Sequence, residues 1–593
     1  MSIRSGARRG LVVLLALAAG FLQSVAWANA ADDRFRAQFG DRFLDRYWSL
    51  NPDYAIVSGY YRYADRLTVL DASFRRDYLR FLDAQIAALA ALPVAQMSEG
   101  PRTDQAVLLN SLRSERWALA EAREWVWDPS SYNVADGFAL LLNTPYAPEV
   151  ERLRTVSARL ARVPAYYAAA KANIERPTRP YTQLAIQQNE GALGVFGEDL
   201  ERQVAGSTLR AEERALFLRR LAAARAAIGD YVHWLKALTE RLDREQGWRD
   251  FRLGPALYEQ GFAYQVQTGG TARQLYERAL QEKDRLHARM ATITDQLWPK
   301  YFGSQPPPAD RVERIGALIA KLSEKHVKRE DFVAATQAMI PQLEAWVRDH
   351  DLLSQDPTRP LVVRVTPPYK RGYAMASIDA PGPYDPTANT YYNVTPLDDY
   401  TPEQAESFLR EYNHWLFQIL NIHEAVPGHY LQLIHANKSP SRIKTLFGNS
   451  AMIEGWAVYS ERMMLESGWG GHEPEMELMH AKWLLRVTCN TILDYSVHAL
   501  QMTEAEGLQL LMREAFQSET EARGKWRRVS VSSVQLTYYF AGFSAIYDYR
   551  ERLKAELGER FDLKRFHEKF LSYGNASVAM IESLMKAEDV ARR

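Results

Sequence analysis

One short segment of the sequence combines three side chains that could bind and use a metal ion. His423 and Glu424 are adjacent, and a second histidine, His429, follows six residues after the first. A His-Glu pair with a second histidine one helical turn later is typical of zinc hydrolases. In these enzymes both imidazoles bind the metal and the glutamate acts on a water molecule. The usual spacing of the histidines is i, i+4, so the i, i+6 spacing here needs an explanation.

The spacing predicts a distorted helix. On a regular helix of about 100° per residue, position i+6 points about 120° away from position i. Pro427 clashes with the carbonyl of His423, and Gly428 can adopt backbone conformations that other residues avoid. We therefore expect Pro427 and Gly428 to be looped out, so that His429 returns to the same metal as His423.

A catalytic zinc site needs a third protein ligand and an open position for water. Glu454, 25 residues after His429, is the best candidate, because its apolar neighbours predict burial and a buried carboxylate needs a partner. Glu461 lies seven residues later on the same face, so it either supports the ligands from outside or replaces Glu454 as a ligand. The alternative for any single helical glutamate is a solvated carboxylate. The pattern predicts one zinc ion per chain.

The elements that carry this motif are predicted to be mainly helical. A helix should begin at Thr401, which forms a capping box with Gln404, and run into the metal motif. Apolar residues at helical spacing predict further amphipathic helices that pack against one another. These stretches are 74–92, 104–125, 148–175, 209–243, 271–297 and 309–350.

One region just before the motif breaks the helical pattern. Residues 361–365, 373–378 and 390–395 predict short strands separated by Pro and Gly clusters, as in a small antiparallel sheet. The segment 390–395 could bind an extended peptide by edge addition, or it could be a plain structural hairpin.

Composition excludes several classes of protein. The chain has 593 residues with 73 basic and 73 acidic side chains, so it lacks the excess of positive charge that nucleic-acid binders use. Its one cysteine, Cys489, excludes intramolecular disulfides and Cys-rich metal sites, and is expected to be an inert core residue. Any metal must therefore be held by His, Asp or Glu.

The N-terminus has the pattern of a signal peptide. A basic segment precedes an apolar run from Leu11, and Ala28-Asn29-Ala30 is a small-x-small site that predicts cleavage after Ala30. The alternative is an uncleaved anchor, but the apolar run is short for a membrane span. We expect residues 1–30 to be removed, leaving a periplasmic or secreted protein without an integral membrane segment. Residues 31–593 should form a single helical catalytic domain, and a division of it into two lobes at about 31–355 and 356–593 stays open.

Several motifs resemble the bacterial family called domain of unknown function 885, which is regarded as a family of zinc metallopeptidases. The resemblance rests on residues 423–429, on the Glu-Gly-Trp-Ala-x-Tyr-x-Glu run at 454–461, and on matching pieces further along the chain. The later pieces include Arg486, Asp494, His498, Gln535, Tyr539, Gly542 and residues 561–567. Tyr430, Ser496 and the Ser533-Val534 pair depart from the family pattern without removing a proposed ligand.

The resemblance implies a mostly helical, gluzincin-like fold with a deep central cleft. It also makes Tyr539 and His498 candidates for stabilising the oxyanion of the reaction, because helical gluzincins recruit Tyr and His from late in the chain. The alternative for Tyr539 is a packed aromatic residue. Asp494 and His498 are spaced i, i+4, so Asp494 could orient the ring for catalysis or only satisfy a buried histidine.

Together these features predict an exported zinc metallopeptidase that hydrolyses peptides or oligopeptides. His423, His429 and Glu454 would hold the zinc, and Glu424 would be the general base. Two alternatives stay open: a helical binding or scaffold protein without catalysis, and a zinc amidase that acts on a non-peptide amide. Glu424 argues against the first alternative, because a structural zinc site has no use for a general base.

Overall fold

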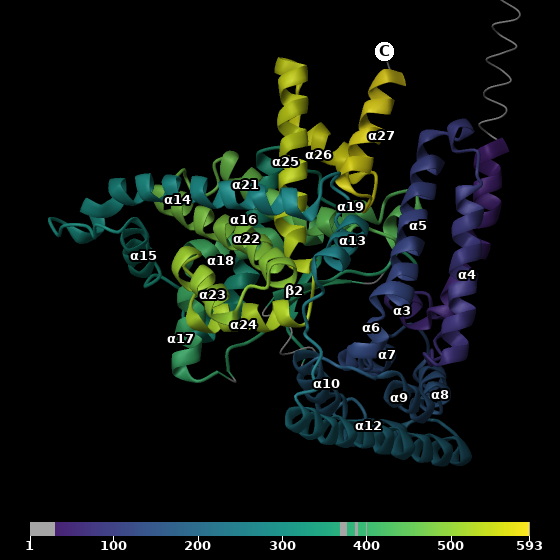
Figure 1. The fold of residues 1–593 in the computed structure, drawn as a ribbon. Helices are drawn as coiled ribbons and strands as arrows, with labels where there is room; N and C mark the ends of the chain where they lie inside the picture. The colour runs from purple at the N-terminus through teal and green to yellow at the C-terminus, as the bar shows by residue number, and fades with distance from the viewer. Residues whose placement is uncertain (1–29, 368–375, 386–388, 399, 592–593) are drawn as a thin grey trace, which may run out of the picture.

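The structure is a computed structural model that describes residues 30–367, 376–385, 389–398 and 400–591 (Figure 1). The predicted signal peptide, except for Ala30, lies outside the described residues. Within the described part of the chain, no helix is long and apolar enough to cross a membrane.

Residues 30–349 are mainly helical, as the apolar periodicity predicted. In α4 (Ala72–Ala90) the predicted stripe residues Tyr78, Leu82 and Leu89 are buried. The other α-helices of this part are α2 (Asp41–Leu50), α3 (Pro52–Val57), α5 (Glu99–Trp117), α6 (Glu124–Trp127), α7 (Ala135–Asn143), α8 (Glu149–Leu160), α9 (Val163–Asn173), α10 (Arg179–Ala192), α11 (Glu198–Gly206), α12 (Ala211–Glu245), α13 (Pro255–Gln265), α14 (Ala272–Phe302), α15 (Arg311–Leu322) and α16 (Phe332–Asp349).

The C-terminal part is also mainly helical and contains the metal motif. Its α-helices are α17 (Pro402–Glu411), α18 (His414–Glu424), α19 (His429–Ala436), α20 (Arg442–Leu446), α21 (Ser450–Glu466), α22 (Pro474–Leu500), α23 (Glu504–Gln509), α24 (Glu519–Ser530), α25 (Tyr538–Leu557), α26 (Leu563–Leu571) and α27 (Val578–Ala591). The predicted mainly helical fold class is therefore confirmed.

The single helix predicted from residue 402 into the metal motif is in fact two helices. Thr401 and Gln404 form the predicted capping box at the start of α17. The chain then leaves the helical path, and Asn413 starts α18. Its side-chain oxygen accepts hydrogen bonds from two backbone N–H groups in the first turn of α18. The prediction of one continuous helix was wrong, because the apolar stripe of α17 continues into α18 and hides the break.

Three short strands form a mixed sheet beside the motif helix. The strands β1 (Leu361–Val365), β2 (Ala376–Asp379) and β3 (Thr390–Val394) lie in the order β1-β3-β2, and β2 contacts α18. The predicted antiparallel pairing is correct for β2 and β3 and wrong for β1 and β3, which are parallel. The connection 366–389 is longer than the dozen or so residues that a parallel pairing requires.

The central place of β3 corrects a second expectation. Both sides of β3 are hydrogen-bonded, one to β1 and the other to β2. Addition of an extended peptide to an edge of this strand, which the sequence left open, is therefore excluded by the sheet order. The alternative of a purely structural role agrees with the observed pairing.

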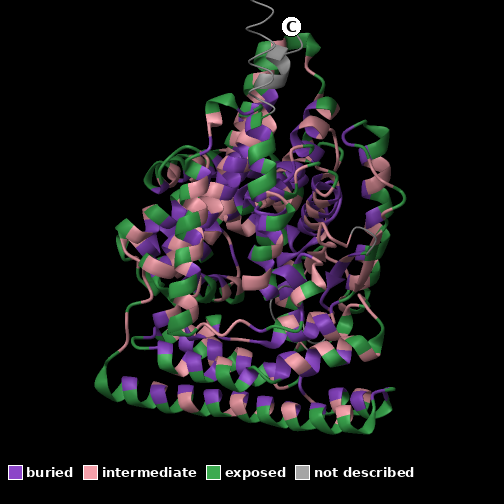
Figure 2. Cartoon of the chain, turned by 90° about the vertical axis from the view of Figure 1, so that its right-hand side faces the viewer, coloured by how far each residue is buried: buried purple, intermediate pink, exposed green. Residues whose placement is uncertain are grey.

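Buried side chains form one large core and two smaller ones. The large core contains residues from both sides of residue 355, among them Trp48 and Leu297 on one side and Trp456 and Phe540 on the other. A second core lies within residues 56–242 and includes one face of α12. Figure 2 shows this long helix at the bottom of the molecule, with buried and exposed positions alternating along it. The third core packs α13 against α22 and α25.

The helices α21 and α25 approach unusually closely, at two glycines. A Cβ atom added to Gly542 would lie 1.7 Å from the carbonyl oxygen of Ala451, and one added to Gly455 would lie 2.3 Å from the carbonyl carbon of Gly542. Only hydrogen fits at either position. The close approach matters for the site, because α21 carries Glu454 and α25 carries Tyr539.

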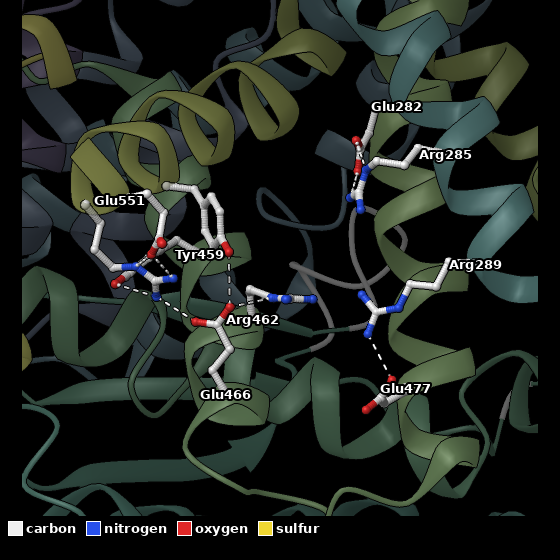
Figure 3. Close-up of polar contacts among 10 residues, drawn as sticks. Glu282, Arg285, Arg289, Tyr459, Arg462, Glu466, Glu477 and Glu551 are labelled. Atoms are coloured by element: carbon white, nitrogen blue, oxygen red, sulfur yellow. Dashed lines mark hydrogen bonds and ion pairs between the residues drawn. The ribbon is translucent and has the colours of Figure 1, made fainter. Parts of the chain in front are cut away.

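Ion pairs also hold these helices together (Figure 3). Glu466 of α21 lies 2.7 Å from Arg550 of α25 and 2.7 Å from Arg462. Arg289 of α14 pairs with Glu477 of α22 at 2.9 Å. Because these pairs are partly exposed, each contributes modestly to stability. They tie together the helices that support the metal motif.

Candidate metal centre

The interruption between α18 and α19 places the two motif histidines. His423 lies in the last turn of α18, and His429 is the first residue of α19. A Cβ atom added to Gly428 would lie 1.9 Å from the carbonyl oxygen of His423, so this tight passage requires glycine. The Val426–Pro427 peptide bond is cis, and the indole N–H of Trp456 donates a hydrogen bond of 3.0 Å to the carbonyl of Pro427. The helix is thus interrupted where the sequence predicted it.

The interruption brings both histidines to Glu454. Nε2 of His429 lies 3.4 Å from Oε2 of Glu454, and Nε2 of His423 lies 3.9 Å from the same oxygen. One potential ligand atom from each of the three side chains lies within 4.8 Å of the others. Among the described residues, this is the one group of three or more His, Cys, Asp or Glu side chains that could hold a metal ion.

The donor atoms of this cluster fit a zinc ion. Two imidazole nitrogens and one carboxylate oxygen form a ligand set that catalytic zinc sites use. Oε2 of Glu454 is buried and accepts no hydrogen bond from the described residues. The nearest polar neighbours of this oxygen are the two histidine nitrogens at 3.4 and 3.9 Å, and a cation between them would satisfy the buried carboxylate better. His423, His429 and Glu454 would therefore hold the metal.

Glu461 lies behind His423 rather than among the ligand atoms. Its Oε1 is 2.6 Å from Nδ1 of His423 and accepts a second hydrogen bond of 2.9 Å from the indole N–H of Trp483. A carboxylate bonded to the other ring nitrogen fixes the tautomer and orientation of a metal-binding histidine. Of the two roles that the sequence left open for Glu461, this position favours support of a ligand.

Burial shifts the pKa values of His423 and Glu424 in opposite directions. It lowers the pKa of His423 to about 3, with a further contribution from His429. The ring of His423 is therefore neutral, and Nε2 keeps the lone pair that a metal needs. Burial also raises the pKa of Glu424 to about 7, against the opposing effect of His429 and with support from Glu454. Glu424 can thus hold or release a proton near neutral pH.

Tyr539 lies near His423, and an arginine holds its hydroxyl. The ring centroids of Tyr539 and His423 are 6.5 Å apart. Nη2 of Arg528 donates a hydrogen bond of 3.0 Å to the hydroxyl of Tyr539 and one of 2.6 Å to Oε1 of Gln535. Tyr539 therefore belongs to the surroundings of the candidate metal centre.

Asp494 and His498 contact the segment that leads to Tyr539 instead of the metal ligands. Asp494 accepts hydrogen bonds of 2.9 Å from the backbone N–H groups of Val534 and Leu536, and a third from the hydroxyl of Tyr258. Nε2 of His498 lies 2.9 Å from two backbone oxygens in residues 529–532. Within the described structure no hydrogen bond joins Asp494 to His498. Both residues are placed to position the segment before α25.

The hydrogen bonds to Asp494 hold a segment whose backbone is strained at Val534. Val534 has a φ of 68°, in the left-handed region that favours glycine. It stands in the Ser533-Val534 pair that departs from the family pattern noted above. The hydrogen bond from its N–H to the buried Asp494 helps to hold this strained backbone.

Two residues of the site, Trp483 and Arg528, had no signal in the sequence. Trp456 lies in the 454–461 run, but its hydrogen bond to the carbonyl of Pro427 was not predicted. Their roles depend on contacts between different helices, which residue spacing along one chain does not encode.

The fold and the site define a class: a mainly helical protein with a candidate His-His-Glu metal centre on adjoining helices. The chain belongs to the family described as "Bacterial protein of unknown function (DUF885)", whose model matches residues 52–585. The resemblance noted from the sequence is therefore confirmed. No curated protein matches the chain at a significant level.

Two solved structures are similar to this chain. The first is described as "a putative lipoprotein of unknown function" from Shewanella oneidensis. It is 52% identical, with a TM-score of 0.84 over 93% of this chain and 99% of that chain. The second, described as "the putative lipoprotein" from Colwellia psychrerythraea, is 16% identical, with a TM-score of 0.74 over 94% of this chain and 98% of that chain. The second likeness concerns the fold alone.

Proposed function

We propose that this protein is an exported zinc-dependent peptidase that hydrolyses peptides or oligopeptides. The observation that carries the proposal is the convergence of His423, His429 and Glu454 beside Glu424, in spite of the unusual histidine spacing. The support of His423 by Glu461 adds to it, since such support tunes metal ligands. Export is supported by the N-terminal pattern, and the solved relative that is 52% identical is described as a putative lipoprotein. We propose that the mature chain begins after Ala30 and resides in the periplasm or is secreted.

The residues of the chain divide the proposed reaction among them. A zinc ion held by the three ligands would polarise the substrate carbonyl and make water more acidic. Glu424, with its pKa near neutrality, takes the proton of the attacking water and passes it to the leaving amine. The hydroxyl of Tyr539, held by Arg528, is the candidate donor to the developing oxyanion. His498 positions the segment before Tyr539 and has no direct part in this scheme.

The substitution Glu424→Gln tests the proposal. It removes the proton acceptor but keeps the size of the side chain and all three ligands, so it should lower peptide turnover by at least about 100-fold. Zinc content should stay unchanged. The measurement is hydrolysis of a fluorogenic peptide library beside elemental analysis of both proteins.

The two alternatives give different results in the same experiment. If the protein is a scaffold, the wild type hydrolyses no peptide. If it is a zinc amidase, the wild type hydrolyses only non-peptide amides, and Glu424→Gln lowers that turnover to the same extent. A variant with full peptidase activity would contradict the assigned mechanism.

A further inference from the structure

A cluster of charged side chains joins α17, α22 and α24 next to the candidate metal centre. Lys482 pairs with Glu411 at 2.9 Å, and Arg486 pairs with Glu521 at 2.9 Å. Arg486 also lies 3.6 Å from Glu411. Both acidic side chains of the cluster are thus already engaged by basic partners.

Two further basic side chains of α24 have no carboxylate of their own. Lys525 is buried, with 7% of its surface exposed, and makes no hydrogen bond or ion pair with the described residues. Arg528, one helical turn later on the same face, bonds only to the neutral groups of Gln535 and Tyr539. A buried cation without a counter-ion is costly. Burial and the charges of Arg486 and Arg528 lower the pKa of Lys525 well below its usual range, and the charges of Glu521 and Glu411 offset this only in part.

Two arginines of this region, Arg528 and Arg486, lie close to the metal centre. Arg528 contacts the hydroxyl of Tyr539, whose ring lies 6.5 Å from that of His423. Arg486 lies over the ring of Trp483, at 5.1 Å from its centroid, and Trp483 bonds to Glu461 behind His423. Arg486 is already paired with Glu521, whereas Arg528 has no carboxylate within ion-pair distance among the described residues and lies beside Tyr539, with Lys525 one helical turn before it.

We propose that Lys525 and Arg528 form a subsite for a carboxylate of the substrate, next to the bond that is cut. This inference rests on the proposed function and names its substrate class: peptides with a negative charge near the scissile bond. The carboxylate is supplied either by a free C-terminus or by an acidic side chain. An anionic group there favours the protonated form of Lys525 and pairs with the exposed guanidinium of Arg528.

The test measures binding and hydrolysis of three matched peptides. The first is N-acetylated with a free C-terminal carboxylate, the second is its C-terminal amide, and the third is an amide with an aspartate before the last residue. Binding is measured by calorimetry to Glu424→Gln, with and without zinc, so that one readout does not depend on catalysis. We expect at least one carboxylate peptide to bind about tenfold more tightly than the neutral amide, and the pattern identifies the source of the charge.

Variants assign this preference to the subsite. Lys525→Met should abolish the preference for the carboxylate peptide, mainly through a higher KM for that peptide. The variant should fold, because it removes a buried amine that has no hydrogen-bond partner among the described residues. Arg528→Gln is a second variant at an exposed position. Arg527→Met is the matched control, because it removes an equal charge from the same helical turn and should keep the preference.

Each other outcome overturns a distinct claim. Hydrolysis of all three peptides with equal binding would overturn the subsite and leave the peptidase. A preference that persists in both Lys525→Met and Arg528→Gln would overturn the assignment to these residues. If zinc-loaded wild type cuts no peptide at all, the proposed function itself fails, and the substrate class fails with it.

Discussion

At the scale of single residues, the account depends on which glutamate touches the metal. Both Glu454 and Glu461 lie on α21 and face the motif histidines, but only Glu454 approaches Nε2 of both histidines. Glu461 instead bonds to Nδ1 of His423. The sequence could not decide between them, because seven residues on a helix return to nearly the same face. Which ring nitrogen a carboxylate meets depends on the rotation of the imidazole.

The substitution Glu461→Gln separates these roles. Loss of the carboxyl group behind His423 should weaken zinc binding about 10- to 100-fold without abolishing it. A competition titration with a chelator measures the change. Trp483→Phe, which removes one hydrogen bond to Glu461 but keeps the carboxylate, should have a smaller effect. A Glu461→Gln protein that loses zinc as completely as Glu454→Gln would show that Glu461 is a ligand.

At the scale of elements, the sequence predicted the helix interruption at Pro427 and Gly428, because proline and glycine act through local sterics. It did not predict the break between α17 and α18. Asn413 is an ordinary capping residue, but it lies within a continuous apolar stripe, and the pattern of the stripe was the stronger signal. The pairing of β1 with β3 was also missed, because strand direction depends on the path of the intervening chain.

The crossing of α21 and α25 is the element-scale feature that sets the site. Gly542→Ala would place a methyl group against the carbonyl of Ala451 and force the helices apart. We expect a loss of about 3 kcal/mol in the free energy of unfolding, at the upper end of typical overpacking costs. Tyr539, on α25, would also move away from Glu454. Urea unfolding measures the first effect.

A matched control is Gly524→Ala on α24, where a Cβ atom meets nothing within 4 Å. This change should leave stability equal or slightly higher, because alanine favours a helix over glycine. If Gly542→Ala has the same free energy of unfolding as Gly524→Ala, the result would contradict the close contact between α21 and α25.

At the scale of the whole molecule, composition and periodicity predicted a mainly helical protein correctly. They did not predict how the halves share their cores. The largest core mixes residues from both sides of residue 355, for example Trp48 and Trp456. Amphipathic stripes show that a helix packs, but not against which partner, so the arrangement of the cores had to come from the structure.

Buried neutral histidines should make the stability of the whole molecule depend on pH. His567 lies between Tyr459 and the backbone oxygen of Leu352, and burial lowers its pKa to about 4. The unfolded chain binds a proton at this residue near pH 6.5, whereas the folded chain does so only near pH 4. Stability is therefore present above pH 6.5 and is lost as the pH falls to 4, by roughly 3 kcal/mol from this residue.

The difference between wild type and His567→Gln in urea unfolding at pH 7 and pH 4.5 measures this contribution. The variant should show a smaller loss on acidification. The exposed His233 offers a control, and His233→Gln should keep the dependence of wild type on pH. Equal slopes for wild type and His567→Gln would contradict the buried neutral state.

The central claim is that the Pro-Gly interruption delivers His429 to the same metal as His423. Elemental analysis of the purified chain 31–593, beside the variants His429→Ala and His435→Ala, tests it most directly. His435 lies on the same helix α19 but bonds to the backbone of Ser354, so its removal should leave the metal in place. The account predicts about one zinc per chain in wild type and His435→Ala and none in His429→Ala. No zinc in wild type after supplementation, or equal zinc in His429→Ala, would contradict it.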